Sequence, residues 1–382
     1  MPGPLDGVRV VELAGIGPGP FAAMLLADMG AEVVRVERVA PQAGRPGADV
    51  ATRDVINRGR RSVAVDIRNP AGRDLVLDLV ERSDVLLEGF RPGVAERLGL
   101  GPDACLQRNP RLVYGRMTGW GQEGPLAQFA GHDINYISLT GALWATGRAQ
   151  DKPVPPLNLV GDYGGGGMFL AFGVACALLE AGRSGQGQVV DAAMVDGSAV
   201  LSTMFTAMRA MGAWTNQRGV NPLDTGFPHY EVYECADGKF ISVGALEPQF
   251  YAELVRRTGF QEEGDRLDPA TFADRKERWA ALFLTKTRDE WARIAAESDA
   301  CLAPVLDWEE APRHPHLQAR GTYVEVDGIV QPAPAPRFSR TPGEIRRGPV
   351  PLGADTDAVL AELGRSRDEI GKLRADGIVG GS

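Results

Sequence analysis

Strand-like and helix-like patterns alternate along the first third of this chain, and this alternation restricts the fold more than any other feature. The strand-like runs are short and apolar, at 8–13, 32–36, 62–66, 85–88 and 112–116. Helix-like patterns separate them, at 21–29 and again after Asn69, an N-cap residue followed by Pro70 at the first helical position. Strands that alternate with helices form a parallel sheet with right-handed crossovers. We therefore expect a Rossmann-like α/β large domain.

The pattern changes after residue 161, and further along the chain it predicts a smaller α+β domain. A glycine run at 164–167 precedes an expected helix to about residue 179, a strand at 189–193 and a helix to about 211. Two strand patterns then flank Asp237-Gly238, a strong hairpin signal, and a proline-rich stretch at 331–336 is expected to be a linker. The predicted division is 1–200 as the first part of the large domain, 201–224 as a linker helix region, 225–325 as a small α+β domain, and 326–382 as a linker and C-terminal segment that returns to the large domain.

Composition excludes several classes of protein. A hydrophobic fraction of 44% and a charged fraction of 24% over 382 residues argue against disorder, and a net charge of −9 argues against a nucleic-acid partner. The uncharged run 163–179 is shorter than the roughly 20 residues that a membrane span needs, so we expect a buried helix there. The N-terminus has no signal-peptide pattern, and four cysteines without a Cys-x-x-Cys pair fit reduced thiols. These features predict a cytoplasmic protein.

Arginine is concentrated between residues 35 and 61, where seven arginines stand against three acids. A guanidinium group grips phosphate with two hydrogen bonds, so the cluster is compatible with a small polyanionic ligand. The alternative is general codon bias, because the whole chain has 36 arginines and only 5 lysines. Both interpretations stay open on composition alone.

A glycine-rich turn follows the first strand and imitates a dinucleotide-binding motif. It reads Gly15-Ile-Gly17-Pro-Gly19-Pro20, with Glu37 about 20 residues further on. Pro20 stands where the motif needs its third glycine, which disfavours a dehydrogenase. Other catalytic motifs, such as a phosphate-binding loop or a Gly-x-Ser-x-Gly elbow, are missing from the sequence. His314-Pro-His316 is better explained as a plain loop than as a metal site.

A histidine and an aspartate form the most specific candidate site. His132 stands in Gly131-His132-Asp133-Ile-Asn-Tyr136, and Asp162 follows thirty residues later, before the glycine run and its helix. A helix start favours negative charge, and an imidazole and a carboxyl in one pocket suit proton transfer at carbon. The alternative is a helix-start histidine and a helix cap, which the residue types alone favour.

Several motifs together resemble family III CoA-transferases over nearly the whole chain. They are Pro4-Leu-Asp-Gly-Val-Arg-Val-Val-Glu12, Leu26-Ala-Asp-Met-Gly30, Asp84-Val-Leu-Leu-Glu-Gly-Phe-Arg91, Glu96-Arg-Leu-Gly99, Gly185-Gln-Gly-Gln-Val-Val-Asp191, Arg337-Phe-Ser-Arg-Thr-Pro342 and Leu352-Gly-Ala-Asp355. Within that family, 131–136 and Asn158-Leu-Val-Gly-Asp162 resemble the α-methylacyl-CoA racemase branch, particularly its bacterial form. The transferases tend to have a bulky aromatic residue where His132 stands, so the histidine favours the racemase branch.

The resemblance implies roles for individual residues. His132 and Asp162 would be two bases on opposite faces of the substrate α-carbon, and Glu247 would support His132 from the same or the partner subunit of an interlocked homodimer. The residues implied in CoA binding are Ile16, Arg38, Val65, Asp66, Ile67, Arg68, Gly89, Phe90, Arg91, Arg97, Gly131, Asp133, Tyr136, Asn158, Gly161 and Tyr163. At Arg68 the racemase pattern often has Lys, and region 40–52 looks longer than in the family, which leaves the phosphate contacts there open.

The implied reaction interconverts (2R)- and (2S)-2-methylacyl-CoA thioesters by proton transfer through an enolate. We expect N–H donors at the helix start near Asp162 to stabilise the enolate oxygen. We expect no cofactor or metal, since CoA is part of the substrate, and no nucleic-acid or membrane-spanning partner. Met204, Met208 and Met211 recur at helical spacing and either line the acyl site or pack in a core.

Two alternatives remain from the sequence. A CoA-transferase would form an aspartyl-acyl anhydride through Asp162 and pass CoA to a second carboxylic acid. A non-catalytic CoA-binding protein would keep the arginines without a working acid–base pair.

Overall fold

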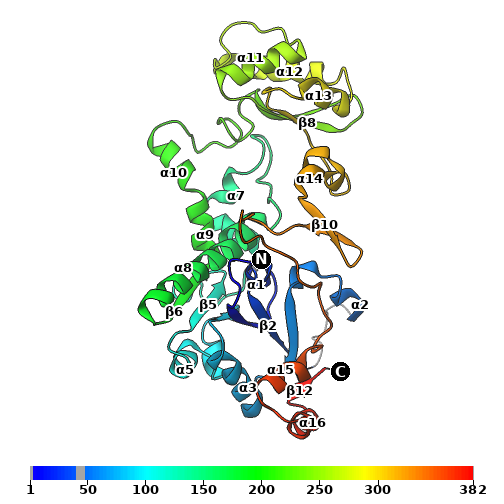
Figure 1. Cartoon of the computed structure of the whole chain (residues 1–382). Helices are drawn as coiled ribbons and strands as arrows, with labels where there is room; N and C mark the ends of the chain where they lie inside the picture. The colour runs from blue at the N-terminus through cyan, green and yellow to red at the C-terminus, as the bar shows by residue number, and fades with distance from the viewer. Residues whose placement is uncertain (1–2, 40–47, 382) are drawn as a thin grey trace. The chain divides into compact units, whose positions relative to one another are not determined.

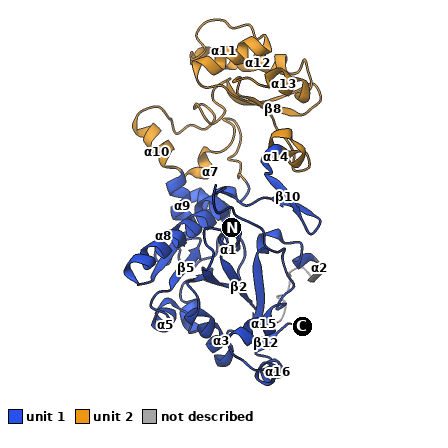
Figure 2. Ribbon diagram, in the orientation of Figure 1, with its two compact units in different colours: residues 1–140, 157–201, 319–382 blue, residues 141–156, 202–318 orange. Residues whose placement is uncertain are grey.

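The chain forms two compact units, each built from segments that are distant in the sequence. The computed structural model describes residues 3–39 and 48–381 (Figure 1), so most of the long region predicted at 40–52 lies outside the described residues. Unit 1 consists of 1–140, 157–201 and 319–382, and unit 2 of 141–156 and 202–318 (Figure 2).

Unit 1 is built on a seven-stranded sheet in the order β12-β3-β2-β1-β4-β5-β6. Its strands are β1 (Arg9–Leu13), β2 (Glu32–Glu37), β3 (Arg60–Val65), β4 (Val85–Glu88), β5 (Val113–Thr118), β6 (Gln188–Ala193) and β12 (Val379–Gly380). All neighbouring pairs are parallel except β12 with β3, where Val379 lies opposite Val65. The predicted parallel α/β sheet is confirmed, and the antiparallel edge strand β12 was not predicted.

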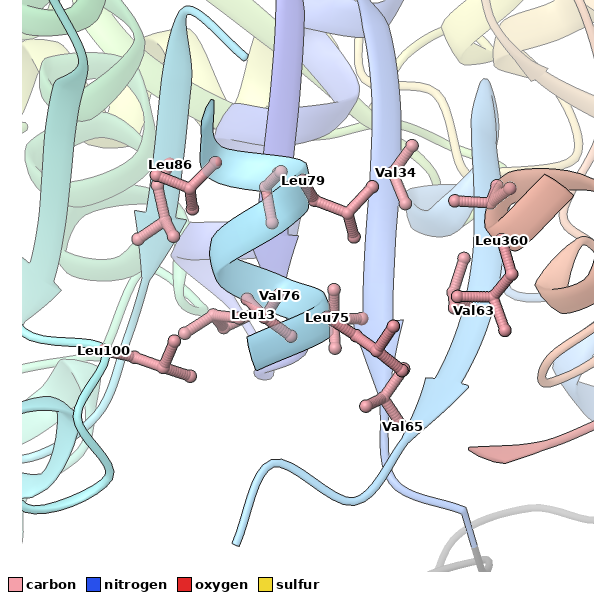
Figure 3. Packing of buried hydrophobic residues seen from close by; sticks show 14 of the residues in the cluster. Leu13, Val34, Val63, Val65, Leu75, Val76, Leu79, Leu86, Leu100 and Leu360 are labelled. Carbon is pink, nitrogen blue, oxygen red and sulfur yellow. The ribbon is translucent and has the colours of Figure 1, made fainter. Parts of the chain in front are cut away.

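Alternate residues of the strands pack into two hydrophobic cores, one on each face of the sheet. Leu13, Val34 and Val63 belong to the first core, which Figure 3 shows from α3 to Leu360, and Val10 and Val33 belong to the second. The first core includes residues of α3 (Pro70–Glu81), α5 (Pro102–Arg108), α15 (Thr356–Glu362) and α16 (Arg367–Ala375), and the second includes residues of α1 (Pro18–Asp28) and α8 (Met168–Ser184). Covering both faces is what an all-apolar parallel strand requires.

The start of α3 follows from its sequence as predicted. The Asn69 side chain accepts a hydrogen bond from the Ala71 N–H at 2.9 Å, and Pro70 occupies the first turn. The side chain thus satisfies one of the N–H groups that a helix start leaves free.

The glycine run forms a π-helical segment, η2 (Leu159–Gly167), that continues directly into α8. Glycine is needed because α9 (Met194–Leu201) lies against η2: a Cβ on Gly165 would stand 2.7 Å from the Ser198 nitrogen, and one on Gly197 would stand 1.8 Å from the Gly165 oxygen. The remaining short elements of unit 1 are α2 (Ala48–Ala51), η1 (Val55–Asn57), α4 (Val94–Arg97) and α6 (Asp133–Leu139).

Helix α8 is buried on one face only, so the prediction of a buried helix is half correct. Leu170 and Val174 pack into the second core, whereas Phe172 and Leu179 are 69% and 59% exposed. The 26 residues of Leu159–Ser184 are long and apolar enough to cross a membrane by length and composition. In this fold the inward face of the helix instead packs against β5 and β6.

Unit 2 contains a three-stranded antiparallel sheet, β7-β8-β9, and a core rich in aromatic side chains. The predicted hairpin is confirmed: β7 and β8 pair across Gly238, whose φ of 72° favours glycine. Its elements are α7 (Ala142–Ala145), α10 (Thr203–Ala210), β7 (Tyr230–Glu234), β8 (Phe240–Gly244), α11 (Pro248–Thr258), η3 (Pro269–Thr271), α12 (Phe272–Phe283), α13 (Arg288–Ala295), β9 (Leu302–Pro304) and η4 (Ala311–Arg313).

Two expectations about connections were wrong. The helix predicted to run to 211 is broken at Ser202, between α9 and α10, where the chain passes from unit 1 to unit 2. The stretch 331–336 is not all linker, because Gln331 and Pro332 belong to β11 (Ile329–Pro332), which pairs with β10 (Tyr323–Val326). The turn between them, Asp327-Gly328, carries the same Asp-Gly signal that revealed the other hairpin. Helix α14 (Pro315–Arg320) precedes this pair.

Candidate active site

A cavity of about 780 Å³ lies in unit 1 at the carboxyl ends of β1, β4 and β5. In the order β2-β1-β4, the chain reverses its direction across the sheet between β1 and β4, and α/β proteins bind ligands at such points. The lining includes the turn after β1, the segment after β4 and the glycine-rich loop after β5, at 14–20, 87–92 and 117–120.

His132 and Asp162 both line this cavity. His132 is the exposed residue that precedes α6, and its N–H donates to Asn135 Oδ1 at 3.0 Å. Asp162 lies in the first turn of η2, and the positive charge of His132 acts to lower the pKa of its carboxyl. The two candidate bases therefore face one cavity from two different helices.

The Asp162 carboxyl is half-buried, and burial raises its pKa. The negative charge of Asp133 acts in the same direction, while the Asn158 amide, which donates to Asp162 Oδ2 at 3.1 Å, and His132 oppose it. Gly17 approaches the same carboxyl, with a φ of 71° and a Cβ position 3.5 Å from Asp162 Oδ2. A carboxyl with a raised pKa holds its proton more readily at neutral pH, as an acid catalyst must.

The two N–H groups next to the Asp162 carboxyl already have hydrogen-bond partners. The Asp162 N–H donates to Asp133 Oδ2 at 2.8 Å, and the Tyr163 N–H donates to the Asn158 carbonyl oxygen at 3.3 Å. The π-helical turn and the buried Asp133 thus use two of the N–H groups at the helix start near Asp162, where donors to an enolate oxygen are predicted.

The arginine cluster is mainly structural, so the phosphate interpretation is wrong for its buried members. Arg35 and Arg60 pair with Glu12 at 2.8 Å each, and Arg58 pairs with Asp28 at 2.6 Å. Arg61 pairs with Glu362 near the surface. Arg45 lies outside the described residues.

Glu12, Arg35 and Arg60 hold the glycine-rich turn that lines the cavity. Arg35 Nη2 donates to the Gly15 carbonyl oxygen at 3.3 Å, and Arg60 donates to the Pro20 carbonyl oxygen. Both ends of the turn are thereby fixed to one buried carboxylate. Proline is acceptable at position 20 because it lies in the first turn of α1, where a helix leaves backbone N–H groups without a partner.

The cavity brings together part of the predicted CoA-binding set. The members that line it are Ile16, Gly89, Phe90, Arg91, Gly131, Tyr136, Asn158 and Tyr163, and those that do not are Arg38, Val65, Asp66, Ile67, Arg68, Arg97, Asp133 and Gly161. The Val65 side chain packs in the first core, which leaves only its main chain for a ligand. Asp133 and Gly161 are buried against each other.

Sequence reasoning missed the aromatic wall of the cavity. Trp120 and Phe129 line it, and Trp120 packs edge to face against Tyr136 with ring centroids 4.7 Å apart. Gly119 and Gly131 leave room for the Tyr136 ring, which a Cβ at either position would contact at under 3.0 Å. The signal that could have found this wall is the glycine-rich loop at 118–125, because glycines leave room for rings to pack against the backbone.

The other predicted features lie elsewhere or remain without a partner. Glu247 is an exposed residue at the start of α11 in unit 2. Helix α10, which carries Met204 and Met208, has no buried residue, so the core-packing alternative for these methionines is wrong within the described chain. Within residues 3–39 and 48–381, no group of three or more His, Cys, Asp or Glu side chains is arranged to hold a metal. The four cysteines are free.

Comparisons with known proteins match this architecture. The family model described as CoA-transferase family III matches residues 5–356. The chain is 46% identical to mouse α-methylacyl-CoA racemase and 43% identical to the human protein, covering 98% of this chain and 97% of each relative. A crystal structure of a CAIB/BAIF family protein from Brucella suis, 27% identical, covers 95% of this chain with a TM-score of 0.81, and this chain covers all of it. The chain therefore belongs to family III of the CoA-transferases.

Proposed function

We propose that this protein is an isomerase, a racemase of 2-methyl-branched acyl-CoA thioesters. The observation that carries the proposal is that His132 and Asp162 line one cavity at the carboxyl ends of β1, β4 and β5. A histidine at this position, together with identities of 43–46% to two α-methylacyl-CoA racemases, favours racemisation within the family.

The two bases act on opposite faces of the α-carbon. From one enantiomer, neutral His132 removes the α-proton, the thioester becomes an enolate, and protonated Asp162 delivers a proton to the other face. From the other enantiomer, ionised Asp162 removes the proton and charged His132 delivers one. The raised pKa of Asp162 supports the first direction, because burial favours its neutral form.

The remaining parts of the proposal come from the resemblance. CoA is part of the substrate, no separate cofactor or metal takes part, and Glu247 supports His132 from its own or the partner subunit. The protein acts as a cytoplasmic homodimer. The exposed apolar face of α8 supports the dimer, since such a face on a folded chain is typical of an interaction surface. The exposed side chain of Met204 on α10 supports contact with an apolar acyl chain.

A single incubation separates racemisation from CoA transfer. The protein is mixed with one enantiomer of a 2-methylacyl-CoA in D₂O, without an acceptor acid, and the product is analysed by chiral chromatography and mass spectrometry. We expect the opposite enantiomer, carrying deuterium at C2, because the donating acid has exchanged with solvent. Transfer of CoA to an added carboxylate without inversion would instead identify a transferase.

The two bases are then tested separately. His132→Ala and Asp162→Ala should each abolish racemisation in both directions, because inversion needs both groups. Each variant can still exchange the α-proton with retention from the enantiomer that faces the remaining base. Racemisation at the normal rate in His132→Ala would show that His132 is structural. Loss of both activities together with CoA binding would favour a misfolded variant, which a thermal melt identifies.

A further inference from the structure

Asp133 is a buried carboxylate behind the cavity, and its only hydrogen bond in the described structure is to Asp162. It is 6% exposed, and Oδ2 accepts the Asp162 N–H at 2.8 Å. Its second oxygen, Oδ1, is buried without a hydrogen-bond partner, and no cation pairs with Asp133 among residues 3–39 and 48–381. A charged group in this setting interacts strongly with its neighbours, because little water screens it.

The contact between Asp133 and the Asp162 peptide is tight. A Cβ at Gly161 would lie 2.4 Å from Asp133 Oδ2, a distance that real Cβ atoms do not adopt. Glycine at 161 therefore lets the carboxylate press against the peptide that joins Gly161 to Asp162. The resulting hydrogen bond fixes the first turn of η2, from which the Asp162 side chain enters the cavity.

Few charges other than Asp133 act on the Asp162 carboxyl. The elements packed against η2 and its flanks carry Asp28, Tyr114, Arg116, Asp133, Tyr136, Glu180, Arg183, Asp191 and Asp196, with His132 just before α6. Within the described residues, only Asp133 and His132 carry charges that act on Asp162 to a resolved extent. The two oppose each other, since the like charge of Asp133 raises the pKa of Asp162 and His132 lowers it.

We propose that Asp133 is a positioning residue for Asp162, which fixes the peptide of the catalytic carboxyl and favours its proton-donating form. The assignment rests on the proposed function and replaces the CoA contact that the resemblance implied for Asp133. Its hydrogen bond sets the place of Asp162, and its negative charge makes ionisation of Asp162 less favourable. Both effects assist the reaction in the direction in which Asp162 delivers a proton to the α-carbon.

Asp133→Asn separates charge from position, because an amide oxygen still accepts the N–H. The test measures kcat/KM against pH in the wild type and the variant, for the enantiomer whose racemisation uses Asp162 as the proton donor. The acid limb is the part of this pH profile that reports the ionisation of Asp162. The negative charge of Asp133 raises the pKa of Asp162, so removing that charge should move the acid limb to lower pH. Asp133→Ala also removes the acceptor, and we expect kcat to fall about a hundredfold with little change in KM, as for a small misplacement of a catalytic group.

Two further variants keep the result interpretable. Asp84→Asn is the control. Asp84 also accepts a hydrogen bond from a backbone N–H, that of Arg9 at 2.8 Å, but it does not line the cavity. Both kcat and the acid limb of the pH profile should therefore stay unchanged in this variant. Gly161→Ala displaces the Asp133 carboxylate without removing its charge and should lower kcat. Thermal melts check the fold of every variant.

A substrate-free measurement separates this inference from the proposed function. The ¹³C signal of the Asp162 carboxyl, assigned with Asp162→Asn, is followed against pH in the wild type and in Asp133→Asn. A lower titration midpoint in Asp133→Asn would support the inference even if the wild type failed to racemise, which would count against the function alone. An unmoved midpoint together with an unmoved acid limb would overturn the role of Asp133.

Discussion

Arg38 and Arg53 are the exposed arginines between 35 and 61 that have no ion-pair partner among the described residues. Arg38 follows β2, on the same side of the sheet as the end of β1. The buried arginines of the cluster are held by Glu12 and Asp28, so these two exposed arginines remain available to a phosphate, and the resemblance implies Arg38.

Arg38→Ala should raise KM by about tenfold to over a hundredfold, the effect of losing a charge-assisted hydrogen bond. The value of kcat should change little, because the contact is shared by ground and transition states. Steady-state kinetics with a 2-methylacyl-CoA measure both. Arg111→Ala is the control, since this exposed arginine precedes the amino end of β5, whereas the cavity lies at the carboxyl ends of the strands. An unchanged KM would place the phosphate contact elsewhere, with Arg91 of the cavity wall as the next candidate.

At this scale the sequence reveals reactive groups better than the groups that support them. His132 and Asp162 stand in short motifs, so their chemistry is visible before the fold is known. The contacts of Glu12 with Arg60 and of Asp133 with the Asp162 N–H join residues that are far apart in the chain. Only strand register and helix packing bring such partners together. Whether Arg35 binds phosphate or Glu12 therefore depends on tertiary structure.

Among the elements, strand β11 is held to the N-terminal part of unit 1 by a buried polar group. Arg58 pairs with Asp28 at 2.6 Å and donates to Gln331 Oε1 and the Pro332 carbonyl oxygen at 2.8 Å each. Arg58 and Asp28 are 3% and 2% exposed. Removing one partner of a buried pair leaves the other charge uncompensated.

Arg58→Ala should lower the free energy of unfolding by about 3–5 kcal/mol. The comparison is Arg61→Ala, whose pair with Glu362 is near the surface and should cost about 0–1 kcal/mol. Urea unfolding followed by circular dichroism measures both. If both variants lost the same free energy of unfolding, the buried Arg58 contacts would contribute no more to stability than the surface pair.

The elements that the sequence predicted are those with complete local signals. Asn69-Pro70 marks the start of α3, and Asp237-Gly238 marks the β7–β8 hairpin. The two-residue strand β12 has no pattern of its own and exists because β3 offers a free edge. The interruption at Ser202 likewise follows from the passage between units, which no local signal encodes.

For the whole molecule, the outward face of α8 bears on assembly. Met168, Phe172 and Leu179 recur at helical spacing and are exposed in the single chain. If a second copy covers this face, the solution mass should be twice the 40.8 kDa of one chain, measured by light scattering after size exclusion.

Phe172→Glu with Leu179→Glu should shift that mass toward a single chain, because burying two carboxylates opposes association. Val330→Glu, at another exposed apolar position of unit 1, is the control and should leave the mass unchanged. A single-chain mass in the wild type would contradict the dimer. Co-flotation of the wild type with lipid vesicles would instead assign the face to a membrane surface.

The late return of the chain to unit 1 has a consequence for biosynthesis. A ribosome completes β1 to β6 before it reaches residues 319–380, which supply Gln331, α15, α16 and β12. Until then, the edge of β3 has no partner strand, and Val63 and Val65 lack the cover that α15 and α16 give to their core. An uncovered apolar edge strand is a template for aggregation. The nascent chain thus passes through an interval in which β3 is open to pairing with other chains, and a chain that ended before residue 351 would stay in that state.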